Sequence, residues 1–258
     1  MATDGSWQGR PFRSYALELH AVRHCNLSCK GCSQSSPLLG EAYEDVELMQ
    51  QALSNLSGAL ICQKLQVLGG EPLLHPRLID ILRVASKSGL APSLSIKTNG
   101  LLLSRMPEAF WQLTNHVIVS VYPATNQVLS RGRKCLDERA AAHGTILSFR
   151  QFPQFRYITK SQATASSALV THTFQRCEYK RFTHSLRAGR LYRCAPSVNL
   201  ASAQNFREEA GDSIDVLSPL NLDSRLTQFL SSDKPLNTCR FCLGSSGSSV
   251  DHSLDNET

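Results

Sequence analysis

Residues 15–32 read YALELHAVRHCNLSCKGC. The first nine, from Tyr15 to Arg23, are predicted to form a strand that runs straight into a cluster of cysteines. Cys25, Cys29 and Cys32 fall within eight residues. The end of this strand therefore presents three potential metal ligands close together, and the rest of the chain is interpreted outward from this point.

Helices and strands are expected to alternate from these cysteines to about residue 150. The helices are predicted at 44–57, 76–89, 107–114 and 125–143, and further strands at 64–70, 94–100, 116–123 and 145–152. This alternation predicts βαβ units and a parallel sheet. Because fewer than eight strands can be found, the expected fold class is α/β, with a partial (β/α)6 TIM-type barrel in place of a closed one.

The pattern changes after about residue 155. Residues 160–173 are rich in Ser and Thr, and 181–196 are typical of a hairpin that turns at Ala188-Gly189, followed by one short helix within 217–232. Four parts are therefore predicted: an N-terminal extension (1–14), the barrel (15–155), a small second domain (156–243) and a disordered Gly/Ser-rich tail (244–258).

The composition indicates a cytoplasmic globular protein. No apolar run approaches the roughly 18 residues that span a bilayer, and no signal peptide is visible, so no membrane partner is expected. Nine cysteines, an odd number, in a reducing compartment favour metal ligands over disulfides. Cys62 and Cys135 lie in or beside predicted helices and are expected to pack in the core.

The net charge of +6 is too modest to predict nucleic-acid binding. Basic residues are concentrated between Arg176 and Arg193. This segment is either a solvated basic face or an electrostatic attraction for an anionic substrate, a reductant or RNA.

The first cysteine set predicts an iron–sulfur cluster. Three thiolates with no fourth ligand nearby would leave one iron of a [4Fe–4S] cluster open to a small molecule. The C-x3-C-x2-C spacing resembles that of the radical S-adenosylmethionine (SAM) superfamily. In that superfamily a reduced cluster cleaves SAM, and the resulting 5′-deoxyadenosyl radical abstracts a hydrogen atom from the substrate.

Further motifs extend this resemblance in the expected order. Gly69, Gly70 and Glu71 resemble the superfamily's GGEP motif, which implies that they hold the methionine end of SAM. Asn99, in a TNG sequence, and Ser120 stand where the superfamily often places polar SAM contacts. Gly31 departs from the pattern, because the residue before the third cysteine is often an aromatic that contacts adenine.

Four cysteines remain for a second site, namely Cys177, Cys194, Cys239 and Cys242. Their layout around the predicted hairpin resembles the twitch domain, a shortened SPASM domain found in small radical SAM enzymes such as aminocyclitol dehydrogenases. The resemblance implies a second, fully coordinated [4Fe–4S] cluster that accepts an electron. A structural zinc site of four cysteines and unliganded buried thiols are the alternatives.

The resulting functional expectation is a radical SAM oxidoreductase that acts on a small polar metabolite of the sugar or aminocyclitol type. Arg150, Arg156 and Lys160 follow the last clear strand, and one of them is expected to contact the substrate or take its proton. The resemblance also implies an electron donor of the flavodoxin or ferredoxin type. The alternatives are maturation of a peptide by cross-link, thioether or epimer formation, and a non-enzymatic iron–sulfur protein.

Overall fold

The computed structural model describes residues 11–255 of the chain. The strands in this range are β1 (Phe12–Val22), β2 (Leu60–Gly69), β3 (Leu94–Thr98), β4 (His116–Val121), β5 (Ile146–Gln151), β6 (Gln154–Tyr157), β7 (Thr183–Arg187), β8 (Arg190–Tyr192), β9 (Ser213–Asp215) and β10 (Ser248–Asp251). The α-helices are α1 (Val46–Leu56), α2 (Leu78–Lys87), α3 (Glu108–Leu113), α4 (Asn126–Ala142), α5 (Ser167–Arg176), α6 (Tyr179–Phe182), α7 (Ala195–Ala203) and α8 (Leu222–Ser231). Short 3-10 helices are η1 (Ser36–Leu38), η2 (Pro72–Leu74), η3 (Leu103–Arg105), η4 (Asn237–Phe241) and η5 (Gly244–Ser246).

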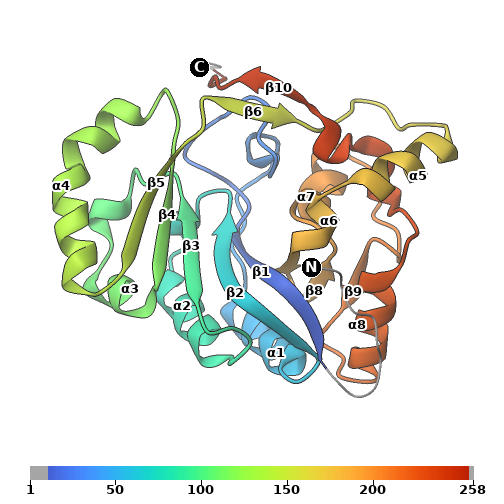
Figure 1. Cartoon of the computed structure of the whole chain (residues 1–258), viewed down its shortest axis with the longest axis horizontal. Helices are drawn as coiled ribbons and strands as arrows, with labels where there is room; N and C mark the ends of the chain where they lie inside the picture. The colour runs from blue at the N-terminus through green and yellow to red at the C-terminus, as the bar shows by residue number, and fades with distance from the viewer. Residues whose placement is uncertain (1–10, 256–258) are drawn as a thin grey trace.

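One large sheet organises the molecule, in the strand order β5-β4-β3-β2-β1-β7-β8-β9 (Figure 1). The six strands from β5 to β7 in this order run parallel, and β8 and β9 continue the sheet antiparallel. The predicted α/β class with a partial TIM-type barrel is confirmed. Since β7 pairs directly with β1, the sheet continues across the boundary that the sequence predicted near residue 155.

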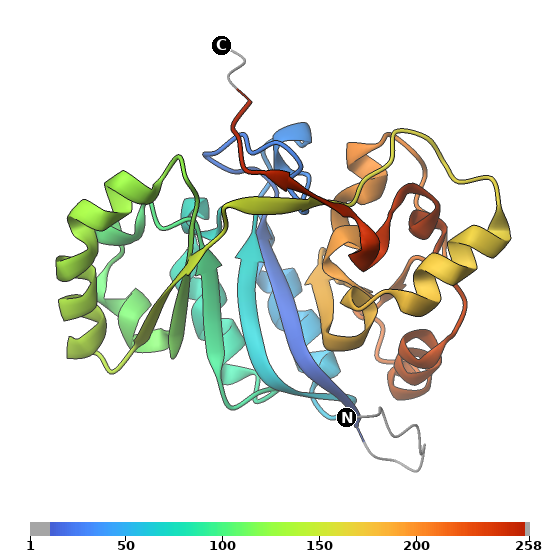
Figure 2. The same ribbon diagram turned by 45° about the horizontal axis from the view of Figure 1, so that its top comes forward.

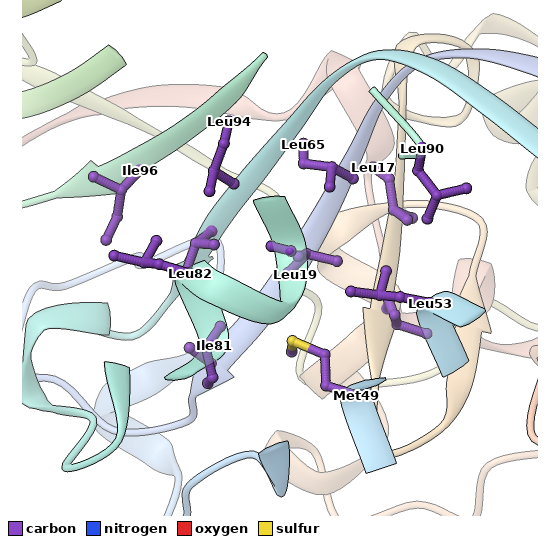
Figure 3. Packing of buried hydrophobic residues seen from close by; sticks show 14 of the residues in the cluster. Leu17, Leu19, Met49, Leu53, Leu65, Ile81, Leu82, Leu90, Leu94 and Ile96 are labelled. Carbon is purple, nitrogen blue, oxygen red and sulfur yellow. The ribbon is translucent and has the colours of Figure 1, made fainter. Parts of the chain in front are cut away.

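The hydrophobic core lies between the sheet and its helices. Leu17 and Leu19 of β1 point to this side and pack near Met49 and Leu53 of α1, with Ile81 and Leu82 of α2 beside them (Figure 3). The opposite face of β1 carries Glu18 and His20. This alternation fixes which side of the sheet can be polar, because successive side chains of a strand point to opposite faces.

The hairpin is confirmed where the sequence placed it. Strands β7 and β8 pair antiparallel, and Ala188 and Gly189 connect them with φ values of 47° and 66°. Two consecutive residues with positive φ form the tight turn that matches the twist of the strands. Helix α7 begins directly after Cys194, which ends the segment that follows β8.

The expected disordered tail is wrong for residues 244–255. Strand β10 pairs antiparallel with β6, and together they cross the carboxyl ends of the parallel strands (Figures 1 and 2). The Gly/Ser composition gave no strand signal, but pairing with a partner distant in sequence orders the segment. Residues 1–10 of the predicted extension and 256–258 of the predicted tail lie outside the described range.

The two solitary cysteines differ in their surroundings. Cys62 is buried, and its thiol lies 3.5 Å from the Leu90 carbonyl oxygen, as expected for a core residue. Cys135 is exposed on α4, so its predicted core position is wrong. The buried residues of α4 are Leu129, Leu136 and Ala140, which places Cys135 outside the apolar stripe. Among residues 11–255, no helix is long and apolar enough to span a membrane.

Candidate active site

The three cysteines of the first set share one cavity. Cys25, Cys29 and Cys32 lie in the loop after β1 and line a cavity of about 400 Å³ at the carboxyl ends of the parallel strands. Ligands of parallel α/β folds bind at this edge, because the loops that follow the strands gather there. The volume lies in the range typical of small-molecule sites.

Burial keeps the Cys25 and Cys29 thiols protonated in the protein alone. It raises the pKa of Cys25 to about 11 and that of Cys29 to about 12. A thiol in this state becomes a ligand only when a metal displaces its proton. Three thiols that open on one cavity therefore fit a bound iron–sulfur cluster.

The spacing of the side chains does not suit a single ion. Across residues 11–255, no group of three His, Cys, Asp or Glu side chains is arranged to hold one metal ion. In a four-iron cluster each thiolate binds a different iron, so the sulfurs need not converge on one point.

The Gly69-Gly70-Glu71 turn packs directly against the chain just before the cysteines. The Gly70 amide donates to the Val22 carbonyl at 2.7 Å, and the Glu71 amide donates to the His24 carbonyl at 3.0 Å. A Cβ atom on Gly70 would lie 1.9 Å from the His24 carbonyl oxygen. Only glycine fits at this position. The two hydrogen bonds fix the position of the backbone where the cysteine loop follows β1.

Glu71 joins the ends of β2 and β3. Its side chain is 1% exposed and accepts hydrogen bonds from the Leu73 amide, the Thr98 hydroxyl at 2.6 Å and the Asn99 amide at 2.8 Å. Burial raises its pKa to about 7 despite these three donors. The carboxyl group therefore organises the TNG turn, and its contact with SAM stays a prediction.

Asn99 and Ser120 line the same cavity, so the structure brings all five predicted SAM-contacting residues to it. The Asn99 amide donates to Asn26 Oδ1 at 2.7 Å and lies 3.7 Å from Cys25 Sγ. Asn99 Oδ1 accepts from the Leu101 amide at 3.0 Å. The side chain of Asn99 thus ties the turn after β3 to the cysteine loop.

Gly31 leaves room for a side chain from another element. Its φ is +70°, and a Cβ atom there would lie 3.2 Å from the Tyr157 ring and 3.7 Å from Val250. The ring comes from β6 and the methyl group from β10. An aromatic residue therefore does lie beside the third cysteine, but it is contributed by a strand that sequence reasoning did not place there.

Only one of the three predicted substrate residues lines the cavity. Arg156 of β6 lies at its edge and donates to the Ser245 carbonyl. Arg150 is exposed on β5, opposite Ser120 in the register, and is not a lining residue. Lys160 donates to the Thr164 hydroxyl at 2.6 Å and lies closer to the second cysteine set, where burial raises the pKa of the Cys242 thiol and the charge of Lys160 opposes that rise.

Two charged residues of the cavity were missed. Glu18 of β1 is 8% exposed and accepts from the Ser185 hydroxyl at 3.1 Å, and burial raises its pKa. Lys97 of β3 lines the same cavity, and its positive charge opposes that rise. The sequence did contain a signal for both: Glu18 lies inside the apolar segment YALELHAV and Lys97 inside LSIKT. A charged group is costly to bury without a partner, so a charge inside a buried strand indicates a polar site.

The second cysteine set surrounds a separate, smaller cavity. Cys177, Cys194, Cys239 and Cys242 all line it, brought together from the end of α5, the start of α7 and η4. Burial raises the pKa of Cys239 to about 12 and that of Cys242 to about 11. The Cys239 and Cys242 thiols, like those of Cys25 and Cys29, would become ligands when a metal displaces their protons.

Basic side chains accompany this second set, but they do not form one face. Lys180 and Arg193 line the small cavity, and both lie over the Phe174 ring. Arg187 instead donates to Asn199, and Arg190 donates to Ser213. Two cations next to four thiols would offset the negative charge of a bound thiolate cluster.

Tyr179 lines both cavities. It is the first residue of α6, two positions after Cys177. Burial raises the pKa of its hydroxyl, and the positive charge of the neighbouring Arg156 opposes that rise. The side chain therefore separates the larger cavity from the second cysteine set.

Comparisons with known proteins agree with this geometry. The family profile described as Radical SAM superfamily matches residues 20–143. The GTP 3′,8-cyclase of Chlorobaculum tepidum is 33% identical over 85 residues, which cover 33% of this chain and 26% of that enzyme. The GTP 3′,8-cyclase of Xanthomonas campestris pv. campestris is 32% identical over 140 residues, which cover 50% of this chain and 40% of that enzyme. The matched segments thus span two fifths or less of these cyclases.

Similarity of fold extends over almost the whole chain. The crystal structure of BtrN in complex with AdoMet and 2-DOIA superposes with a TM-score of 0.58 at 15% identity, covering 91% of this chain and 94% of BtrN. BtrN in an open conformation gives a TM-score of 0.53 at the same identity. Residues 20–143 thus match a radical SAM domain, and the cysteine triad, the GGEP turn and the TNG turn of this segment surround one cavity.

Proposed function

We propose that this chain is a cytoplasmic oxidoreductase that cleaves SAM reductively and oxidises a small polar metabolite of the sugar or aminocyclitol type. Cys25, Cys29 and Cys32 would hold the catalytic [4Fe–4S] cluster, and the other four cysteines would hold the second one. When bound, the catalytic cluster and SAM supply one-electron chemistry that removes a hydrogen atom from an unactivated C–H bond. The electron donor would be of the flavodoxin or ferredoxin type.

The observation that carries this proposal is the second cavity with its four cysteines. Four thiolates saturate a four-iron cluster, which leaves no open iron to grip a substrate. Such a cluster is suited to electron transfer. Removal of a hydrogen atom leaves a substrate radical, and a net oxidation needs an acceptor for one further electron.

The chain's own residues would bind and orient SAM and the substrate. Gly69, Gly70 and Glu71 would face the methionine end of SAM, with Asn99 and Ser120 along its length. Glu18 and Lys97 offer opposite charges inside the cavity, and Arg156 offers a cation at its edge. Groups of both signs suit a substrate with hydroxyl and amino groups, because each can pair with one of them.

Two matched sets of variants test the assignment after anaerobic reconstitution. Wild type is expected to bind roughly eight irons per chain, and replacement of Cys25, Cys29 and Cys32 by alanine should leave about half and abolish SAM cleavage. Replacement of the four C-terminal cysteines should preserve cleavage and remove net oxidation. Cys135→Ala is the control, because this exposed thiol belongs to neither set.

The substrate is identified by deuterium transfer. Candidate deuterated sugars and aminocyclitols are incubated with SAM and reductant, and 5′-deoxyadenosine is examined for the label. Transfer from such a compound, with a two-electron oxidised product, supports the proposal. Zinc in place of iron at the second cysteine set would remove the electron acceptor and would contradict net oxidation. Deuterium transfer from a peptide, with none from sugars or aminocyclitols, would show that the substrate is a peptide.

A further inference from the structure

The segment 248–255, called the C-terminal strap below, is joined to the loop that carries the first cysteine set. The Lys30 amide donates to the Ser253 carbonyl at 2.9 Å, and the Asp255 amide donates to the Ser28 carbonyl at 2.7 Å. An ion pair of 3.2 Å joins Lys30 to Asp255. The strap therefore continues beyond β10 alongside the cysteine loop, where Leu254 and Cys29 form an isolated antiparallel bridge (Figure 2).

His252 is the residue of the strap that faces the cysteines. Its ring stacks on Tyr122 with centroids 4.7 Å apart and an angle of 8°, and it meets the edge of Phe155 at 4.9 Å. Its backbone amide donates to the Pro153 carbonyl at 2.9 Å. The side chain is 8% exposed, so packing holds the imidazole in one orientation.

That orientation brings His252 Nε2 to 3.3 Å from Cys29 Sγ. A thiolate bound to iron offers only lone pairs, so a stable contact needs a hydrogen on the facing nitrogen. The other ring nitrogen, Nδ1, is buried and makes no hydrogen bond with the described residues. A hydrogen on Nδ1 would remain unpaired and would turn the Nε2 lone pair toward the sulfur, so the Nε2–H tautomer is favoured.

We propose that His252 is a positioning residue that donates a hydrogen bond to Cys29 Sγ and thereby raises the reduction potential of the catalytic cluster. This inference rests on the proposed role of Cys29 as a cluster ligand. Hydrogen bonds to cluster sulfurs favour the reduced state, which carries more negative charge, and partners of this kind orient the ligand they touch. The other side-chain donor to this cysteine set within residues 11–255, Asn99, lies 3.7 Å from its sulfur and contacts Cys25 instead.

The test is a redox titration of the reconstituted holoenzyme, followed by the electron paramagnetic resonance (EPR) signal that changes on addition of SAM. His252→Phe keeps an aromatic ring over Tyr122 but removes the donor, and its midpoint should move to a more negative potential. His252→Gln retains an N–H donor and should stay closer to wild type. His172→Phe, an exposed position on α5, should have no effect.

A measurement on the wild-type protein tests the inference even when the His252 variants fail to fold. Protein labelled with [15N]histidine should show weak nitrogen coupling to the reduced catalytic cluster in pulsed EPR. An unchanged midpoint in His252→Phe with full iron content overturns the inference, as does equal displacement in both His252 variants or the absence of histidine coupling in wild type. If the Cys25, Cys29 and Cys32 variants still cleave SAM, the ligand assignment itself fails, which is a separate result.

Discussion

At the scale of single residues, Glu71 combines two roles that can be separated. Its carboxylate holds Thr98 and Asn99, and we propose that it also binds SAM. Glu71→Ala should weaken SAM binding at least tenfold, about 1.4 kcal/mol, with iron content intact. Titration calorimetry on the reconstituted protein measures this. Thr98→Val removes one partner of the carboxylate and should lower stability with a smaller effect on SAM, so equal losses of affinity in the two variants would contradict a direct contact.

His184 predicts the direction of a pH dependence. It is buried, its Nδ1 lies 3.1 Å from the Arg193 carbonyl oxygen, and burial lowers its pKa from 6.5 to about 4. Between these values the unfolded chain binds a proton that the folded chain does not. Stability from this group is therefore present above pH 6.5 and lost as the pH falls toward 4, by up to roughly 3 kcal/mol.

Urea unfolding between pH 5.5 and 8 checks this expectation. His184→Gln should flatten the loss of stability on acidification, whereas His172→Gln, at an exposed position, should leave the slope as in wild type. An unchanged slope in His184→Gln would show that other groups dominate acid sensitivity.

At the scale of elements, the turn after β2 sets the position of the loop after β1. Gly70→Ala would bring a methyl group to within 1.9 Å of the His24 carbonyl unless the backbone moves. The variant should fold less stably and assemble less iron at the first site, because the cysteine loop begins at this contact. Iron analysis after reconstitution tests it. Gly132→Ala, in α4 with open space around its Cβ position, is the matched control and should bind iron as wild type does.

At the scale of the whole molecule, Asn199 connects the two cysteine regions. It donates to the Gln34 carbonyl at 3.0 Å and accepts from Arg187 at 2.8 Å, and it lies on the helix that begins after Cys194. Asn199→Ala should cost about 2 kcal/mol of stability, because the half-buried Gln34 carbonyl and the half-buried Arg187 guanidinium both lose a hydrogen-bond partner. Chemical unfolding measures this, with the exposed Asn126→Ala as control. A loss below about 0.5 kcal/mol would show that this bridge is not needed.

Local sequence patterns were sufficient to predict the strands of the partial barrel, but not the β6–β10 pair that crosses the carboxyl ends of those strands. Apolar periodicity and turn residues predicted β3, β4 and the β7–β8 hairpin, because these features depend on near neighbours. Spacing predicted that the cysteines form two sets, and each set lines its own cavity. Tyr157 and His252 were missed, because each reaches the cysteine loop through the β6–β10 pairing, which the local sequence does not encode. Glu18 and Lys97 were missed although each is a charged residue inside an apolar strand.

The position of the strap near the C-terminus means that it is synthesised long after the cysteine loop that it contacts. Cys29 and His252 are 223 residues apart in the chain. At typical rates of protein synthesis, roughly 10–45 s pass between the appearance of the two residues. The cysteine loop is thus synthesised before the strap that packs against it. If the loop binds a cluster as proposed, the order of synthesis provides an interval in which the cluster can be inserted before the strap packs against the loop.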